Sequence, residues 1–104
     1  IDVKILILNN HYLGMVRQWQ QLFHDKRYSF VDIQSPDFVQ VAKGYGIAGN
    51  SVNKRENLKQ ALQTMLDHNG SYLLEVEVGK EDNVFPMVPQ GRGVAEIVLR
   101  KEDI

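Results

Sequence analysis

Two adjacent asparagines, Asn9 and Asn10, follow an apolar run and are the first candidates for chemistry in this sequence. The run, residues 5–8, is continuous rather than alternating, which predicts a parallel strand covered on both faces. The asparagines then lie at the carboxyl end of that strand, where open α/β sheets bind their ligands. An amide side chain at that edge offers a carbonyl oxygen, which suits a hard cation such as Mg²⁺.

The competing interpretation of Asn9 and Asn10 is a simple turn. Asparagine tolerates left-handed backbone, and its side chain can accept a hydrogen bond from its own main chain. For the pair taken alone the turn is the favoured interpretation. The case for a metal site therefore depends on the residues that surround the pair.

A helix is predicted directly after the pair, over residues 14–23. Its apolar residues recur at spacings of one, three and four, so they share one broad face. An ordinary amphipathic helix would bury that face and leave the polar one in solvent. The apolar face consists of Met15, Val16, Trp19, Leu22 and Phe23, and the polar face of Arg17, Gln18, Gln20 and Gln21.

The other elements alternate between strand and helix. Strands are predicted over residues 3–8, 47–52 and 72–78, with helices before the second and the third. Ser35 is expected to cap the first of these helices, and Asn53 with Glu56 to cap the second as a capping-box-like pair. Strands separated by helices imply a parallel sheet, so the predicted fold class is α/β.

The last part of the chain has a different composition. After Gly79 it becomes polar, and residues 85–93 hold all but one of the prolines, which predicts an extended tail with a short helix over 94–99. We therefore expect a domain portion over residues 1–79 and a C-terminal tail over 80–104. Three strands make an incomplete ligand crevice, so residues 1–79 are interpreted as the C-terminal half of a larger doubly wound, mostly parallel sheet domain.

Composition excludes several classes of function. The 104 residues suffice for one small core, and a net charge of −1 gives no electrostatic argument for nucleic acid or an anionic membrane. The chain has no cysteine, which rules out disulfides and thiol chemistry and fits a reducing compartment. No apolar run reaches transmembrane length. The sequence opens on Ile1 rather than methionine, and we interpret it as a piece of a longer protein.

Several short motifs, taken in order, resemble one enzyme family. The pair Asn9-Asn10 resembles the end of the thiamine diphosphate signature, a segment that opens with Gly-Asp-Gly. More narrowly, the chain resembles the catalytic large subunit of acetolactate synthase, also called acetohydroxyacid synthase, and the resemblance spans nearly its whole length. The motifs that carry it are Gly14-Met15, Gln18-Trp19-Gln20, Ser35-Pro36-Asp37-Phe38 and Phe85-Pro86-Met87-Val88-Pro89.

The resemblance implies roles for particular residues. Asn10 aligns with the amide that coordinates the Mg²⁺ bridging the cofactor diphosphate, and the backbone carbonyl of Tyr12 supplies a second oxygen. Gly14 and Met15 are implied to contact the cofactor. Met15 and Trp19 align with residues of the channel for substrate and herbicidal inhibitors. No catalytic residue is expected in this fragment, because the family's catalytic glutamate belongs to another domain of a neighbouring subunit.

The resemblance also implies cofactors and partners. It predicts thiamine diphosphate, Mg²⁺ and an FAD bound by a domain absent here. It further implies 2-oxo acid substrates in branched-chain amino-acid biosynthesis, a homodimer or homotetramer, a regulatory small subunit and a cytoplasmic, bacterial setting. The fragment by itself is expected to be inactive. No role is assigned to Arg92 in the tail.

Two alternatives stay open at this point. One is another thiamine diphosphate-dependent decarboxylase or carboligase, such as glyoxylate carboligase. The other is a free-standing α/β module that binds a protein through the apolar face containing Met15 and Trp19. Of the three histidines, only His11 is retained, as a residue supporting the metal site from behind its ligands.

Overall fold

The computed structural model describes all 104 residues as two compact units. Unit 1 consists of residues 1–11 and 34–79, and unit 2 of residues 12–33 and 80–104. Each unit is therefore assembled from two separate stretches of the chain. None of the helices combines the length and the apolar composition that a membrane span requires.

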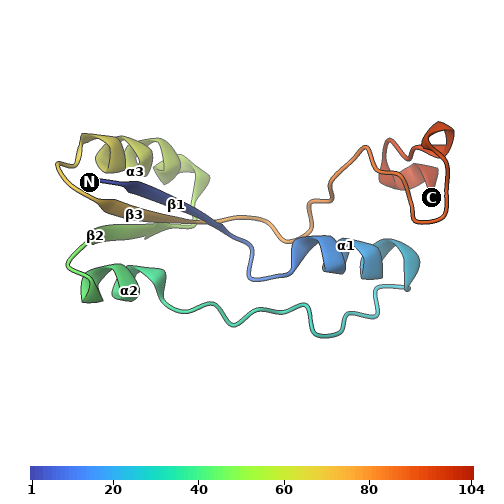
Figure 1. Cartoon of the computed structure of the whole chain (residues 1–104), viewed down its shortest axis with the longest axis horizontal. Coiled ribbons are helices and arrows are strands. Elements are labelled where there is room, and N and C mark those ends of the chain that lie inside the picture. Colours follow the sequence, from blue (N-terminus) through green and yellow to red (C-terminus); the bar gives the residue numbers. More distant parts are fainter. The chain divides into compact units, whose positions relative to one another are not determined.

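Unit 1 is built on a three-stranded parallel sheet, as predicted (Figure 1). The strands are β1 (Lys4–Asn9), β2 (Ala48–Val52) and β3 (Tyr72–Glu77), in the order β1-β3-β2. In the β1–β3 ladder Lys4 lies opposite Tyr72 and Asn9 opposite Glu77. Because all three strands are parallel, their carboxyl ends lie at one edge of the sheet.

Two helices pack on opposite faces of this sheet, α2 (Phe38–Gly44) and α3 (Arg55–Asp67) (Figure 1). Both contact β2 and β3. Alternate residues of β3 face opposite sides of the sheet: Leu74 is fully buried in the core beneath α3, whereas Leu73 lies next to Gly49 of β2, as does Ala42 of α2. The core between α3 and the sheet is formed by Val52, Ala61, Met65, Tyr72, Leu74 and Val76.

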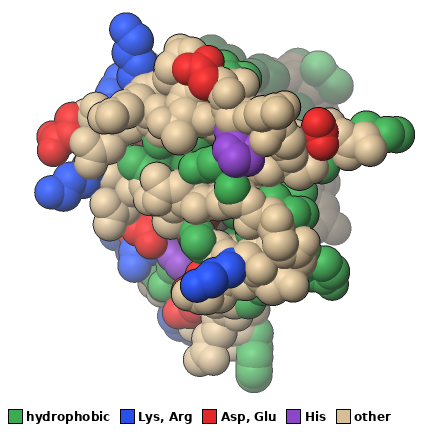
Figure 2. All heavy atoms as spheres, turned by 90° about the vertical axis from the view of Figure 1, so that its left-hand side faces the viewer, with side chains coloured by type: hydrophobic (Ala, Val, Ile, Leu, Met, Phe, Trp, Pro, Cys, Tyr) green, Lys and Arg blue, Asp and Glu red, His purple; other side chains and the backbone are tan.

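The apolar strand β1 is not covered on both faces within this chain, contrary to our prediction. Leu6 is 46% and Leu8 66% exposed. The reason is topological, because β1 is an edge strand that pairs only with β3, while both helices pack over the other two strands. Figure 2 shows further apolar side chains at the surface of unit 1, at the end of the sheet where the strands begin.

The helix starts of unit 1 also differ in detail from the prediction. Asp37, not Ser35, caps α2, because its carboxylate accepts a hydrogen bond from the Gln40 amide at 2.9 Å. The N-cap residue of α3 is Lys54, and no side chain caps this helix, so the predicted pair of Asn53 and Glu56 is wrong. Burial of Ala61 and Met65 supports α3 instead.

Unit 2 contains α1 (Gly14–Phe23), whose bounds match the prediction, and the tail. The tail doubles back on itself rather than remaining extended: Met87 and Val98 exchange two backbone hydrogen bonds of 2.9 and 2.8 Å. The predicted helix over 94–99 is reduced to a 3₁₀ turn, η1 (Val94–Glu96), which a second turn, η2 (Lys101–Asp103), follows.

The most deeply buried residues of α1 belong to its polar face. Arg17 is 5% and Gln18 3% exposed, whereas Met15 and Val16 are 49% and 47% exposed. The polar pair is buried because both side chains hydrogen-bond to residues of the tail within unit 2. Apolar periodicity identified the helix correctly, and Trp19, Leu22 and Phe23 of its apolar face are half-buried, but periodicity gave no sign that Arg17 and Gln18 would be its most buried residues.

Candidate functional site

The carboxyl edge of the sheet in unit 1 carries a polar crevice of about 500 Å³. It lies on the α2 side of β3, since its lining includes side chains from β3 and from the segment leading into α2. Its polar lining consists of His11, Ser35, Asp37, Asn50, Ser51, Glu75 and Glu77. This is the position at which parallel sheets bind ligands.

Asn9 is the buried centre of a hydrogen-bond network beside this crevice. Its side-chain amide donates to Glu75 Oε1 at 2.7 Å. Its Oδ1 accepts from the His11 amide at 2.9 Å and from the Ser35 hydroxyl at 3.3 Å. Asn9 is 7% and Glu75 9% exposed. One side chain thereby joins β1, β3, the turn after β1 and the segment before α2.

The network separates the roles of the two asparagines. His11 has φ 59°, in the left-handed region, and the bond from its amide to Asn9 Oδ1 stabilises that conformation. The turn interpretation is therefore correct for Asn9, whose oxygen already accepts two hydrogen bonds. Asn10, half-buried next to it, remains the predicted metal ligand.

His11 makes one long side-chain contact at the edge of the crevice. Its Nε2 lies 3.9 Å from Glu77 Oε1, and both side chains are about half exposed. Such a contact between solvated groups contributes little stability. No cluster of three or more His, Cys, Asp or Glu side chains that could hold a metal ion occurs in the structure.

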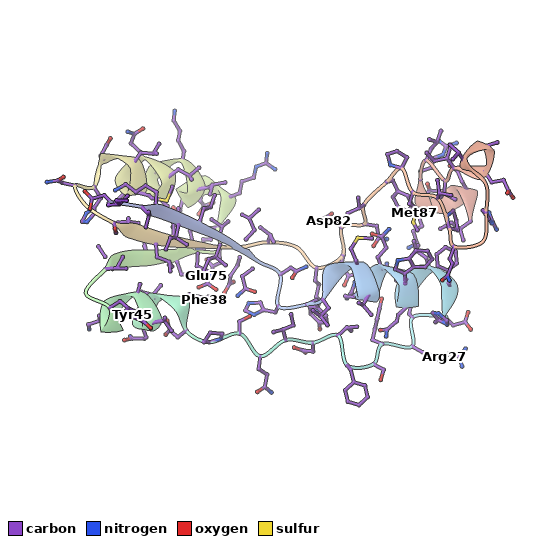
Figure 3. The ribbon with its side chains drawn as sticks, in the orientation of Figure 1. Arg27, Phe38, Tyr45, Glu75, Asp82 and Met87 are labelled. Atoms are coloured by element: carbon purple, nitrogen blue, oxygen red, sulfur yellow. The ribbon has the colours of Figure 1, made fainter.

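Glu75 was missed by the sequence interpretation, although a signal was present. In the strand Tyr72–Glu77 it is the one charged residue within a run of five buried residues. A buried carboxylate requires a hydrogen-bonding partner, so its position in such a strand indicates a specific polar contact. The structure identifies that contact as Asn9 (Figure 3 labels Glu75 near the end of β3).

Unit 2 is organised around the buried Arg17 guanidinium. Its Nη1 donates to the Lys80 carbonyl at 2.9 Å, and its Nη2 pairs with Glu81 Oε1 at 2.7 Å. The same group lies 4.5 Å from the ring centre of Tyr28 and 5.2 Å from that of Tyr12. Arg17 thus connects α1 to the tail, to Tyr12 just before the helix and to Tyr28 in the irregular segment after the helix.

Two glutamines of α1 each hold the backbone of one distant residue at both of its polar groups. Gln18 donates to the Val84 carbonyl at 3.0 Å and accepts from the Val84 amide at 2.7 Å. Its amide nitrogen also lies 3.2 Å from the Met87 sulfur. Gln20 binds Ser29 in the same way, with both distances 3.0 Å.

The residues predicted for the substrate channel lie on the rest of α1. Trp19 is half-buried and stacks at a tilt on Phe23, with ring centres 5.0 Å apart. Trp19 and Val16 line an open hollow of about 570 Å³ in unit 2, with Gln20, His24 and Arg27. Met15 is half exposed but does not line this hollow, and Gly14, at the first position of α1, is exposed.

Comparison with known proteins adds the family. The family described as thiamine pyrophosphate enzyme, C-terminal TPP binding domain, matches residues 1–76. The acetolactate synthase isozyme 2 large subunit of Escherichia coli is 42% identical over 99 residues, which are 94% of this chain and 18% of that protein. The mitochondrial acetolactate synthase catalytic subunit of Saccharomyces cerevisiae is 47% identical over 96 residues, 92% of this chain and 14% of that protein.

A solved structure agrees with the fold. The thiamine diphosphate-dependent 4-hydroxybenzoylformate decarboxylase of Rhodococcus jostii is similar with a TM-score of 0.63 and 31% identity, over 74% of this chain and 15% of that one. Together with the parallel sheet, these matches confirm the predicted fold and family. This chain belongs to the thiamine pyrophosphate enzyme family, in its C-terminal TPP-binding domain, and its curated relatives at 37–47% identity are acetolactate synthases.

Proposed function

We propose that this chain is part of a thiamine diphosphate-dependent acetolactate synthase, which condenses two pyruvates, or pyruvate with 2-oxobutanoate, in branched-chain amino-acid biosynthesis. The supporting observation is its 42% and 47% identity to two acetolactate synthases over more than nine-tenths of its length. The chain spans only 18% and 14% of those proteins. The activity is accordingly assigned to the whole protein, and the isolated chain is proposed to be inactive.

We infer that the metal site uses the Asn10 side chain and the Tyr12 carbonyl to hold Mg²⁺ against the cofactor diphosphate. Both are uncharged oxygen donors, the type that Mg²⁺ accepts while retaining waters and phosphate ligands. The Asn9 oxygen already accepts from two donors within the turn, so Asn9 is not the proposed ligand. The donor atoms of these two residues are therefore of the type that Mg²⁺ binds, and this chain is proposed to provide part of its coordination shell.

When bound, thiamine diphosphate supplies a carbanion equivalent that adds to the carbonyl of a 2-oxo acid. The residues of α1 are proposed to orient the reactants and to exclude water. Gly14 and Met15 contact the cofactor, and Met15 and Trp19 form the wall of the substrate and inhibitor channel. The exposure of Met15 and the hollow beside Trp19 are consistent with side chains that are available to other groups.

The remaining components are proposed from the same relationship. FAD is assigned to a domain outside this chain, and the whole protein is assigned a homodimeric or homotetrameric state with a regulatory small subunit. A cytoplasmic, bacterial setting completes the proposal.

The proposal is tested with the full-length protein that carries this chain. Thiamine diphosphate binding is measured by calorimetry with Mg²⁺ and after chelation, and acetolactate formation from pyruvate is assayed in parallel. We expect Mg²⁺-dependent binding that Asn10→Ala weakens about tenfold or more. Asn57→Ala, at an exposed position of α3, is the matched control and should leave binding unchanged.

Product analysis separates this function from its nearest alternative. A decarboxylase releases the aldehyde, whereas a synthase retains the two-carbon unit in acetolactate. Release of acetaldehyde without acetolactate would refute the synthase proposal while leaving the family assignment intact. In a synthase, Trp19→Leu should change the ratio of products when pyruvate and 2-oxobutanoate compete, because Trp19 is proposed to contact the second substrate.

A further inference from the structure

The pair formed by Asn9 and Glu75 is the most buried polar contact between two strands of unit 1 that the proposed function leaves unused. Asn9 lies opposite Glu77 in the parallel ladder, and Glu75 lies two residues earlier on β3. Residues two apart on a strand project to the same face. The bond is therefore a diagonal contact across the ladder, on the α2 side of the sheet.

Burial and polarity together make this contact specific. Both side chains are at least nine-tenths buried, and the distance between Asn9 Nδ2 and Glu75 Oε1 is 2.7 Å. A buried polar side chain costs free energy unless its groups are paired. Because Glu75 accepts from the Asn9 nitrogen, the side-chain oxygen of Asn9 is directed to the His11 amide and the Ser35 hydroxyl.

We propose that Glu75 is a positioning residue for the metal-binding turn: it fixes the orientation of the Asn9 amide, which in turn holds the turn containing Asn10. A flipped Asn9 amide would present its nitrogen to the His11 amide, and two donors cannot bond. The hydrogen bond that stabilises φ 59° at His11 would then be lost. This inference rests on the proposed function, because it assigns Glu75 a role at the site of Asn10.

Exchanging the two functional groups tests this mechanism directly. Asn9→Asp alone removes the nitrogen donor and places two carboxyl groups in contact, which disfavours the wild-type arrangement. Asn9→Asp combined with Glu75→Gln restores a donor and an acceptor with the roles reversed. The introduced glutamine can then donate from its nitrogen to one oxygen of the introduced aspartate, while the other aspartate oxygen accepts from His11 and Ser35. Glu75→Gln alone retains an acceptor oxygen for Asn9 and is the control.

Two properties of the full-length protein are measured for each variant: the dissociation constant of Mg²⁺ by calorimetry with thiamine diphosphate present, and the hydrogen-exchange rate of the His11 amide. Asn9→Asp should weaken Mg²⁺ binding about tenfold and accelerate His11 exchange. The double variant should return both values to within about threefold of wild type.

The outcomes separate this inference from the proposed function. If Asn9→Asp leaves the Mg²⁺ affinity unchanged in a protein that does require Mg²⁺, the role of Glu75 is overturned while the proposed metal site stands. The role of Glu75 is also overturned if the double variant folds but binds Mg²⁺ more weakly than wild type. This second result can be obtained even if Asn9→Asp itself does not fold. An unmodified protein that binds thiamine diphosphate without any metal overturns the proposed metal site, and this inference with it.

Discussion

Replacing Gln18 of α1 by leucine should release the tail from this helix in unit 2. Leucine has a similar size and helix propensity but no polar group. The substitution removes the hydrogen bonds to the amide and to the carbonyl of Val84, at 2.7 and 3.0 Å. It leaves α1 intact, so its effect should be confined to the segment that Gln18 holds.

The magnitude follows from the number of bonds and their exposure to water. Two hydrogen bonds contribute about 1–3 kcal/mol at typical net values. Gln18 is 3% exposed, but the Val84 side chain is 60% exposed, so water can partly solvate the released backbone groups. We therefore expect a loss of about 1–2 kcal/mol, which corresponds to roughly 5- to 30-fold faster exchange of the Val84 amide.

The assay is amide hydrogen exchange followed by NMR on this chain, with Gln20→Leu as the matched control. Gln20 holds the amide and carbonyl of Ser29 as Gln18 holds those of Val84. Each variant should accelerate exchange at its own partner and leave the other partner at the wild-type rate. Equal acceleration at Val84 and Ser29 in both variants would show general destabilisation of α1. An unchanged rate at Val84 in Gln18→Leu would refute the hydrogen-bond explanation for the burial of this glutamine.

Two further predictions concern unit 1. Leu74→Ala removes a fully buried side chain at the centre of the sheet and should lower the free energy of unfolding by about 2–5 kcal/mol. Leu8→Ala, at a 66% exposed position, should cost much less, and urea titrations of the two variants would contradict the described burial if their costs were equal. Asp37→Ala should cost about 1 kcal/mol through loss of the α2 cap. Ser35→Ala should retain that cap; protection of the Gln40 amide from exchange, measured in both variants, distinguishes the two residues.

The sequence alone was sufficient for α1, for the three strands and for the family, but not for the tail. Local patterns identified α1 with correct bounds and the three parallel strands within one residue at each end. Such patterns are reliable because apolar periodicity and turn residues act over a few neighbouring positions. The predicted family rested on the order of short motifs, and the comparisons confirm it.

Contacts between distant residues were decided only by the tertiary structure. Arg17 and Gln18 looked solvent-exposed because polar side chains usually are, yet their partners lie more than 60 residues away in the tail. In the same way, α2 begins at Phe38, so that Asp37 caps it, while the Ser35 hydroxyl bonds to Asn9, 26 residues earlier. A local pattern contains no information about such partners.

The asparagine pair shows most clearly which properties the sequence predicts and which depend on tertiary contacts. Residue type and position at the end of β1 offered an oxygen-donating site as one interpretation, and the surrounding motifs were needed to favour that site over a simple turn. Only the fold assigned the turn to Asn9, because Glu75 reaches it from a strand 66 residues later and fixes which end of the amide faces the His11 backbone. The physical reason is that a buried amide must satisfy its donor and its acceptor separately, and the partners for each are brought together by strand pairing.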